Sequence, residues 1–264
     1  MKSKIALAFE KCKEQKRPAL ITYTVAGDNT KDNSLKILNS ISKHADIIEL
    51  GFPHNTPIAD GGQIQGSSHR ALKKGIKLKD VFQIVKKFKK SNSEKPLILM
   101  GYFNLIYQNG ESNFIQNCKT SGVDGLIVVD LPPEEDNELC DLAIVRGISF
   151  IRLATPTTDK QRLEKVLQKT SGFLYYVSIA GITGSRKPDL SIVKDAVINI
   201  KQSTNIPIGV GFGIKSKNDI VKILDFADAV IVGSVLVNLI ANNGPASDVK
   251  KKVIRKVEEF ASIM

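Results

Sequence analysis

Two carboxylates that lie close together in the sequence are candidates for acid–base chemistry. Glu49 interrupts the apolar segment 46–51, and Asp60 follows in a loop, directly before two glycines. A strand buried on both faces normally carries aliphatic side chains, so a carboxyl group there is deprived of water and its pKa rises. A pKa near the working pH suits a general acid or base. The pair is therefore a candidate catalytic site, with a salt-bridged structural glutamate and a turn aspartate as the alternative.

Glycines late in the chain are candidates for binding a phosphate group. The segment 211–213 (Gly-Phe-Gly) follows one predicted strand, and Gly233 and Ser234 follow the next, where Ser234 opens a short apolar helix. Backbone N–H groups reach a phosphate oxygen where side chains are absent, and the start of a helix adds a favourable dipole. Gly184 lies in an earlier loop that could complete the site. The alternative is that these glycines serve only tight turns.

The order of apolar segments predicts the elements that position these residues. Eight short apolar runs are expected to be strands, at 19–25, 46–51, 96–102, 125–130, 149–155, 173–178, 206–211 and 229–233. Helical periodicity is expected within 1–16, 32–43, 67–74, 78–90, 112–121, 157–169, 216–226 and 247–262, and from 132 and 189 onward. This alternation over 264 residues predicts an α/β fold, a (β/α)8 TIM barrel with an additional N-terminal helix, as a single domain over 1–264. A doubly wound sheet is the alternative, but the glycines at 209–213 lack the third glycine of a dinucleotide-binding motif.

A TIM barrel places reacting side chains at the carboxyl ends of its strands. One rim is therefore expected to hold Glu49, Asp60, Asp130, Tyr175, Ser178 and Ser234. No predicted strand carries the lysine of an imine-forming aldolase, and the three histidines do not cluster as a metal aldolase requires. What remains is acid–base catalysis by carboxylates on a substrate that supplies its own electron sink.

Composition narrows the class of protein further. The net charge is +11, but the lysines are spread along predicted helices, which argues against nucleic-acid binding and is compatible with an anionic substrate. The run 86–90, which has a Phe among its lysines, is expected to be a solvated helix face with that Phe buried. No apolar run approaches the roughly 20 residues of a membrane span, and no apolar signal-peptide block is present. Cys12, Cys118 and Cys140 are odd in number and widely spaced, which favours reduced thiols. A soluble, cytoplasmic protein is expected.

Several motifs occur together in a specific order along nearly the whole chain. They are the segments 48–51, 57–61, 99–104, 122–127, 130–134, 156–158, 172–178, 183–184, 209–213 and 231–234. In this order they resemble the tryptophan synthase alpha subunit family. The resemblance implies a lyase of tryptophan biosynthesis that cleaves indole-3-glycerol phosphate to indole and glyceraldehyde 3-phosphate by a retro-aldol reaction. Protonation of the indole ring at C3 would create the electron sink, so neither a lysine nor a metal is required.

The resemblance also implies a role for each candidate residue. Glu49 would be the general acid/base, and Asp60 would accept a hydrogen bond from the indole N–H and stabilise its developing positive charge. Thr183 would bond Asp60 when a lid closes over the substrate. The remaining substrate-binding candidates are Tyr175 and Phe212 beside the indole, and Gly184, Gly211, Gly213, Gly233 and Ser234 around the phosphate.

A partner is implied as well. The family pairs with a beta subunit in an alpha-beta-beta-alpha heterotetramer, and pyridoxal phosphate is expected only in that subunit, with no cofactor in this chain. The loops 53–60 and 179–187 would sense the partner. The chain departs from the family in these loops, with His54, Asn55 and Thr56 in place of an aromatic residue, Ser and Asp, and with Ile179 and Ala180 in place of Arg and Thr.

The loop departures leave two readings of His54 and suggest one alternative function, and a second alternative function stands independently of them. His54 is either an ordinary exposed side chain or a pH-sensitive contact to the lid or the partner. One alternative function is a non-catalytic subunit that docks on the beta partner and activates it. The other is a different phosphate-binding barrel enzyme, which the combination of Glu49 and Asp60 argues against.

Overall fold

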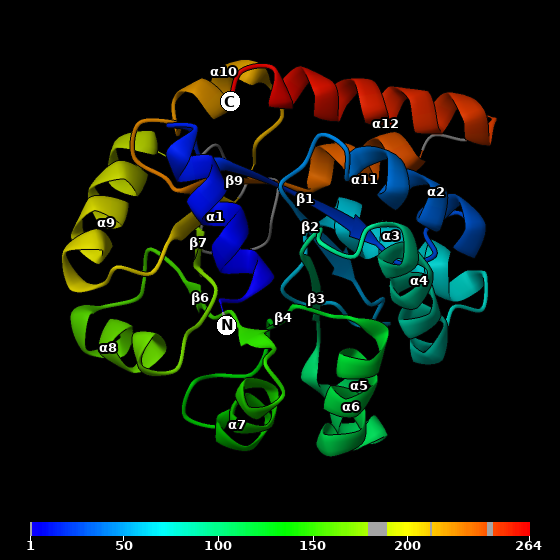
Figure 1. Ribbon diagram of the computed structural model, residues 1–264, viewed down its shortest axis with the longest axis horizontal. Coiled ribbons are helices and arrows are strands. Elements are labelled where there is room, and N and C mark those ends of the chain that lie inside the picture. The colour runs from blue at the N-terminus through cyan, green and yellow to red at the C-terminus, as the bar shows by residue number, and fades with distance from the viewer. Residues whose placement is uncertain (1, 179–188, 212, 242–244) are drawn as a thin grey trace.

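The computed structural model describes residues 2–178, 189–211, 213–241 and 245–264. Its strands form one sheet that curls around a central core, with the order β5-β4-β3-β2-β1-β9-β8-β7-β6 and parallel pairing throughout (Figure 1). The strands are β1 (Ala19–Val25), β2 (Ile47–Gly51), β3 (Leu97–Gly101), β4 (Gly125–Val128), β5 (Ser149–Phe150), β6 (Leu153–Ala154), β7 (Leu174–Val177), β8 (Ile208–Gly211) and β9 (Ala229–Val232).

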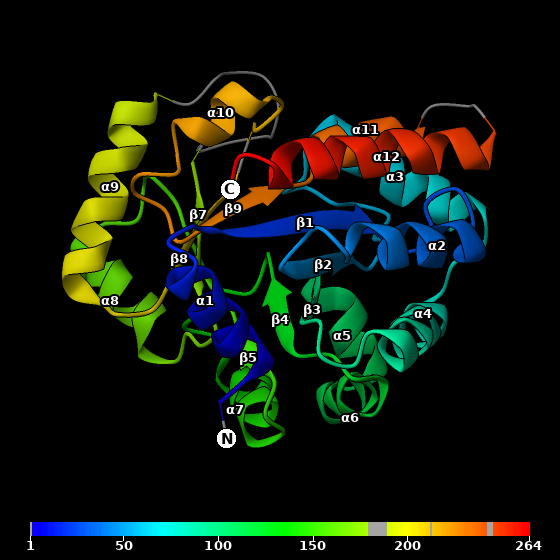
Figure 2. The same ribbon diagram turned by 45° about the horizontal axis from the view of Figure 1, so that its top comes forward.

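Helices surround the sheet and cover its outer face (Figure 2). A helix such as α12 buries Val249, Val253, Val257 and Phe260, which recur at helical spacing and form one apolar stripe. The helices are α1 (Lys4–Glu14), α2 (Lys31–Ile41), α3 (Gly62–Lys73), α4 (Leu78–Ser91), α5 (Phe103–Asn109), α6 (Glu111–Ser121), α7 (Asn137–Val145), α8 (Lys160–Gln168), α9 (Leu190–Ser203), α10 (Lys217–Val221), α11 (Ser234–Ala241) and α12 (Ala246–Ala261). None of the helices described is long and apolar enough to cross a membrane.

The barrel closes through a strand that changes neighbours. The strand expected over 149–155 consists of β5, which pairs with β4, and β6, which pairs with β7. Arg152 lies between the two pieces and its carbonyl accepts the N–H of Tyr175 at 3.0 Å. Its guanidinium is buried and donates to both carboxylate oxygens of Asp136, at 2.7 and 2.6 Å. The predicted TIM barrel is confirmed, and this ion pair anchors the point of closure.

Two long-range contacts alter the predicted helices. The helix expected from residue 132 begins instead at Asn137. The residue before it, Asp136, is buried in the ion pair with Arg152. The short helix α5 was not predicted. Its first N–H, on Phe103, is accepted by the Asp130 carboxylate at 2.8 Å, so a residue from the next βα loop caps it. Helix α10 is also shorter than expected and ends at Val221.

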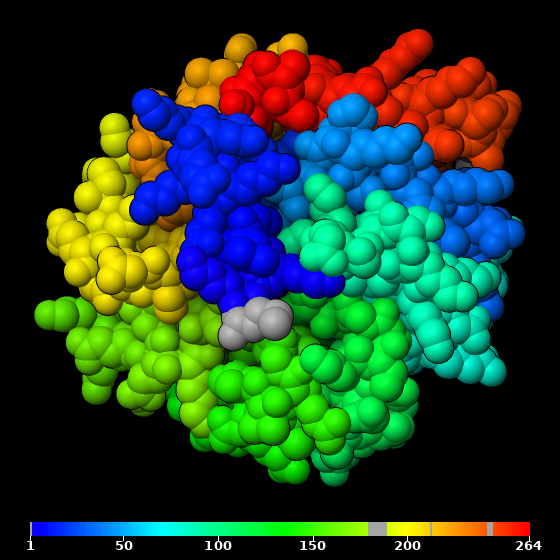
Figure 3. Space-filling view, in the orientation of Figure 1, coloured from blue at the N-terminus to red at the C-terminus, as the bar shows by residue number. Residues whose placement is uncertain are grey.

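The N-terminal helix seals one end of the barrel. Ile5, Phe9 and Cys12 of α1 belong to the same buried cluster as the inward-facing strand residues, and the Phe9 and Phe173 rings lie 5.8 Å apart. In Figures 1 and 3 this helix lies over the centre of the face toward the viewer. The strands begin at this end, since Ala19 and Ala229, the first residues of β1 and β9, belong to the same cluster. The opposite, carboxyl end of the strands is therefore the end available for a site.

Candidate active site

Glu49 is a buried, unpaired carboxyl group inside the barrel. It follows Ile47 on β2 by two residues, and because side chains alternate along a strand it faces the same inner core. Its side chain is 0% exposed, and neither carboxyl oxygen has a hydrogen-bond partner among the described residues. Burial raises its pKa from 4.5 to about 8. The salt-bridged alternative is therefore not observed in the described part of the chain, and Glu49 holds a proton at neutral pH.

Asp60 is the second carboxyl group of the site, and Tyr102 holds it. The Tyr102 hydroxyl donates to Asp60 Oδ2 at 3.1 Å and accepts the N–H of Ala59 at 3.0 Å. Burial raises the Asp60 pKa to about 6, and the hydrogen bond from Tyr102 works against that rise. At pH 7 Asp60 is therefore mostly ionised while Glu49 is mostly protonated.

Two buried tyrosines interact electrostatically with both carboxyl groups. Tyr23 pairs with Glu49 in register between β1 and β2, and Tyr175 lies on β7. Burial raises the pKa of each phenol, and the negative charges of both Glu49 and Asp60 raise it further. Both carboxyl groups therefore lie within electrostatic reach of both phenols. The structure thus brings Glu49 and Asp60 together with Tyr23 and Tyr175.

Glycines make room for these phenols. A Cβ atom on Gly211 would lie 2.3 Å from the Tyr175 hydroxyl, and one on Gly51 would lie 2.2 Å from the Tyr23 hydroxyl. Such distances are far below van der Waals contact, so a side chain at either position would displace a tyrosine. Gly211 therefore has a packing role at the site in addition to its predicted role in binding phosphate.

The glycine loops lie side by side at the rim. Gly211 ends β8 and Gly233 follows β9, and these strands are neighbours in the sheet. Gly213 has a φ of +70°, a backbone conformation that favours glycine. Helix α11 begins at Ser234, and its first turn presents N–H groups that the helix itself does not pair. Gly184, Thr183, Phe212, Ile179 and Ala180 lie outside the described residues.

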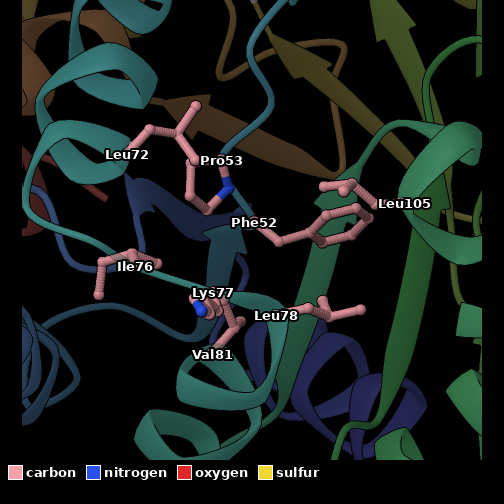
Figure 4. Close-up of a pocket in the computed structure, with 8 residues that line it drawn as sticks. All are labelled: Phe52, Pro53, Leu72, Ile76, Lys77, Leu78, Val81 and Leu105. Atoms are coloured by element: carbon pink, nitrogen blue, oxygen red, sulfur yellow. The ribbon is translucent and has the colours of Figure 1, made fainter. Parts of the chain in front are cut away.

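The loop from β2 to Asp60 packs against the end of β3. The N–H of Phe52 donates to the carbonyl of Met100 at 2.9 Å, and the Phe52 ring fills the space where Gly101 would carry a Cβ, 2.2 Å away. Behind the loop, a cavity of about 270 Å³ is lined by Phe52, Pro53, Leu72, Ile76, Lys77, Leu78, Val81 and Leu105 (Figure 4). It holds none of the predicted site residues, so it is separate from the carboxyl groups.

Tyr102 is, with Tyr23, one of two site residues that the sequence pattern did not indicate. It lies in the motif 99–104, but its hydrogen bond reaches a residue 42 positions earlier in the chain. An isolated tyrosine at a strand end gives no local signal of such a contact. The only available hint was its place at the carboxyl end of a predicted barrel strand.

The arrangement provides two carboxyl groups of different protonation at one site. A pKa of about 8 for Glu49 makes it a proton donor near neutrality, while a pKa of about 6 leaves Asp60 able to stabilise positive charge. None of the nine described strands contains a lysine. Among the described residues, no three His, Cys, Asp or Glu side chains are grouped to hold a metal ion.

Comparison with known proteins identifies the family to which this chain belongs. The family model described as tryptophan synthase alpha chain matches residues 9–264. The tryptophan synthase alpha chain of Pelagibacter ubique (strain HTCC1062) is 54% identical over 243 residues, 91% of each chain. Tryptophan synthase subunit alpha from Legionella pneumophila strain Paris superposes with a TM-score of 0.92 at 35% identity, covering 100% of this chain and 98% of that one.

A third relative comes from an assembled enzyme. A chain from the tryptophan synthase a2b2 complex of the hyperthermophile Pyrococcus furiosus superposes with a TM-score of 0.86 at 40% identity. The match covers 93% of this chain and 98% of that one. Each of these three matches covers at least 91% of both chains. The chain belongs to the tryptophan synthase alpha chain family.

Proposed function

We propose that Glu49 and Asp60 together carry out the reaction of this family in this chain. As a member of the tryptophan synthase alpha chain family the protein is a lyase, and it cleaves indole-3-glycerol phosphate to indole and glyceraldehyde 3-phosphate. The observation that carries the proposed mechanism is the fully buried Glu49, whose pKa of about 8 keeps it protonated near neutrality. Asp60, with a pKa of about 6, supplies the negative charge.

In the first step the protonated Glu49 gives its proton to C3 of the indole ring. The ring then carries a positive charge on its nitrogen, and the ionised Asp60 accepts the hydrogen bond of that N–H and stabilises the charge. The electron pair of the bond between C3 and the glycerol carbon next moves into the ring and restores indole. The Glu49 carboxylate takes the proton of the adjacent hydroxyl, which becomes the aldehyde oxygen of glyceraldehyde 3-phosphate. Glu49 ends the cycle protonated, as it began.

The remaining predicted residues bind the substrate in this proposal. Tyr175 lines the indole site together with Phe212, and Thr183 bonds Asp60 when substrate is bound. The phosphate is held by backbone N–H groups of the glycine loops and the start of α11, namely those of Gly184, Gly211, Gly213, Gly233 and Ser234. The adjacent positions of β8 and β9 support this grouping.

A beta subunit is the proposed partner. The Pyrococcus furiosus relative belongs to an a2b2 complex, and we extend that alpha-beta-beta-alpha assembly to this chain. Two exposed apolar side chains support a docking surface: Ile58, in the loop before Asp60, is 76% exposed, and Tyr107 of α5, the helix after β3, is 69% exposed. Pyridoxal phosphate is assigned to the beta subunit and no cofactor to this chain.

A cytoplasmic location is part of the same proposal. Cys12, Cys118 and Cys140 are free and buried. Burial raises the pKa of the Cys12 thiol to about 12 and that of Cys140 to about 11, so these thiols remain protonated and unreactive. Unpaired thiols of this kind suit a reducing compartment.

Product analysis tests the proposed reaction. The full chain is incubated with indole-3-glycerol phosphate, with and without a tryptophan synthase beta chain, and both products are quantified. We expect equal amounts of indole and glyceraldehyde 3-phosphate, unaffected by a chelator, because no metal takes part. Treating this chain alone with substrate and borohydride, and then removing both, should leave its activity unchanged, because no lysine of the enzyme forms an imine with the substrate. Absence of indole even with the beta chain present would favour the non-catalytic docking subunit, and inactivation by borohydride would require an imine mechanism.

A further inference from the structure

His54, at the start of the loop that carries Asp60, is stacked on Tyr102. The two ring centroids lie 5.0 Å apart with 24° between the ring planes. The N–H of Thr56 points at His54 Nδ1 from 3.1 Å, and because a backbone N–H can only donate, Nδ1 is the acceptor. The histidine is thus fixed on one side by its own loop and on the other by the tyrosine ring. It is partly buried, in contrast to the exposed Asn55 and Thr56 beside it.

The same tyrosine holds the far end of the loop through its hydroxyl. That hydroxyl accepts from the Ala59 N–H at 3.0 Å and donates to Asp60 Oδ2 at 3.1 Å. The loop therefore contacts Tyr102 twice, at the ring face through His54 and at the hydroxyl through Ala59 and Asp60. Tyr102 itself is only 4% exposed and follows β3 directly, so it is a fixed point of the barrel.

We propose that His54 and Tyr102 are positioning residues that set the Asp60 carboxylate for the reaction, with His54 acting through Tyr102. The proposal rests on the function proposed above for Asp60. The stack restrains the tilt of the Tyr102 ring, and the direction of its hydroxyl follows from that tilt. The hydroxyl then fixes the carboxylate oxygen that faces it, leaving the other oxygen for the indole N–H. Neither residue touches the reacting atoms in this account.

The proposal explains why the chain tolerates histidine where the family has an aromatic residue. The flat imidazole supplies a ring face for stacking, as an aromatic side chain does. Its Nδ1 also accepts a hydrogen bond from the N–H of Thr56, two residues further along the loop. The departure from the family pattern at this position thus preserves the contact on Tyr102, and Asp60 remains oriented.

Steady-state cleavage kinetics across pH, on the full chain in complex with a beta chain, test this proposal. Tyr102→Phe keeps the ring and removes the hydroxyl, and we expect kcat to fall about ten- to a hundredfold with little change in KM. The acidic limb of kcat/KM should move to higher pH, because the Tyr102 bond lowers the Asp60 pKa. His54→Ala should lower kcat about three- to tenfold and move the same limb in the same direction.

Two further variants separate positioning from a general effect on the fold. His54→Phe retains a stacking ring and should recover most of the kcat that His54→Ala loses. Introducing His54→Ala into Tyr102→Phe should cause no further loss, since without the hydroxyl the stack no longer reaches Asp60. His44→Ala is the matched control, because His44 contacts Glu258 at 3.2 Å, away from this loop, and its kcat should equal that of the wild type.

The outcomes that overturn the proposal are distinct from those that overturn the function of Asp60. Wild-type kcat and an unmoved acidic limb in His54→Ala, with Asp60→Asn inactive, would overturn the positioning role alone. An undiminished effect of His54→Ala in the Tyr102→Phe background would do the same. Wild-type activity in Asp60→Asn would instead overturn the role of Asp60, and the positioning proposal with it.

Discussion

Replacing Glu49 by glutamine is expected to abolish nearly all cleavage of indole-3-glycerol phosphate. The variant keeps the size and polarity of the side chain but has no proton to give to C3 of the indole ring. Loss of a general acid/base lowers the rate by about a hundred- to ten-thousandfold. The measurement is kcat for indole formation in complex with a beta chain. Glu94→Gln is the matched control, since the Glu94 side chain is 83% exposed and its rate should match the wild type.

The same substitution should stabilise the fold at high pH. The Glu49 pKa is about 8 in the folded chain against 4.5 for the free group, so between these values the folded chain holds a proton that the unfolded chain has lost. The free energy of unfolding of the wild type therefore falls as pH rises from 4.5 toward 8. Glutamine does not titrate, so the advantage of the variant grows over this range and is fully present above it. A variant that cleaves at the wild-type rate, or gains no stability with rising pH, would contradict the account.

Replacing Asp60 by asparagine is expected to produce the second largest loss. Asparagine still accepts a hydrogen bond from Tyr102 but cannot stabilise positive charge on the indole nitrogen. Removal of one preorganised electrostatic group costs about a hundred- to a thousandfold in kcat. The acidic limb of the pH profile, expected near the Asp60 pKa of about 6 in the wild type, should also disappear.

The control for Asp60 is an exposed aspartate. Asp141 lies in an ion pair with Lys169 and its side chain is 60% exposed, so Asp141→Asn should retain both the rate and the acidic limb. An Asp60→Asn variant that changed only KM would mean that Asp60 contributes equally to binding substrate and transition state. That outcome would contradict its role in stabilising developing charge.

The strands were predictable because burial on both faces leaves a simple signal. Apolar runs such as those of β1 and β9 are buried at every position, and the predicted ranges match the observed strands closely. The errors arose where contacts distant in sequence decide local structure. Asp136 delays the start of α7 because it pairs with Arg152, and Asp130 caps α5 from another loop. No local pattern encodes either contact.

The same distinction between local patterns and distant contacts applies to the residues of the site. Glu49 could be predicted because a carboxylate within an apolar strand is conspicuous, and Asp60 because it follows in the same loop. The sequence indicated no role for Tyr102, and neither reading of His54 included its stack on Tyr102. Both contacts depend on how the end of β3 meets the loop after β2. Stacking between two rings leaves no trace in composition or periodicity.

The most direct test of the central claim is a titration of the Glu49 carboxyl group itself. Carbon NMR of protein labelled at the glutamate side-chain carboxyl, with the Glu49 signal identified by its loss in Glu49→Gln, reports its protonation directly. The account predicts a signal that titrates near pH 8, well above the value of 4.5 for the free side chain. A Glu49 signal that titrates near 4.5 would show an ionised side chain at neutral pH and contradict its role as the proton donor.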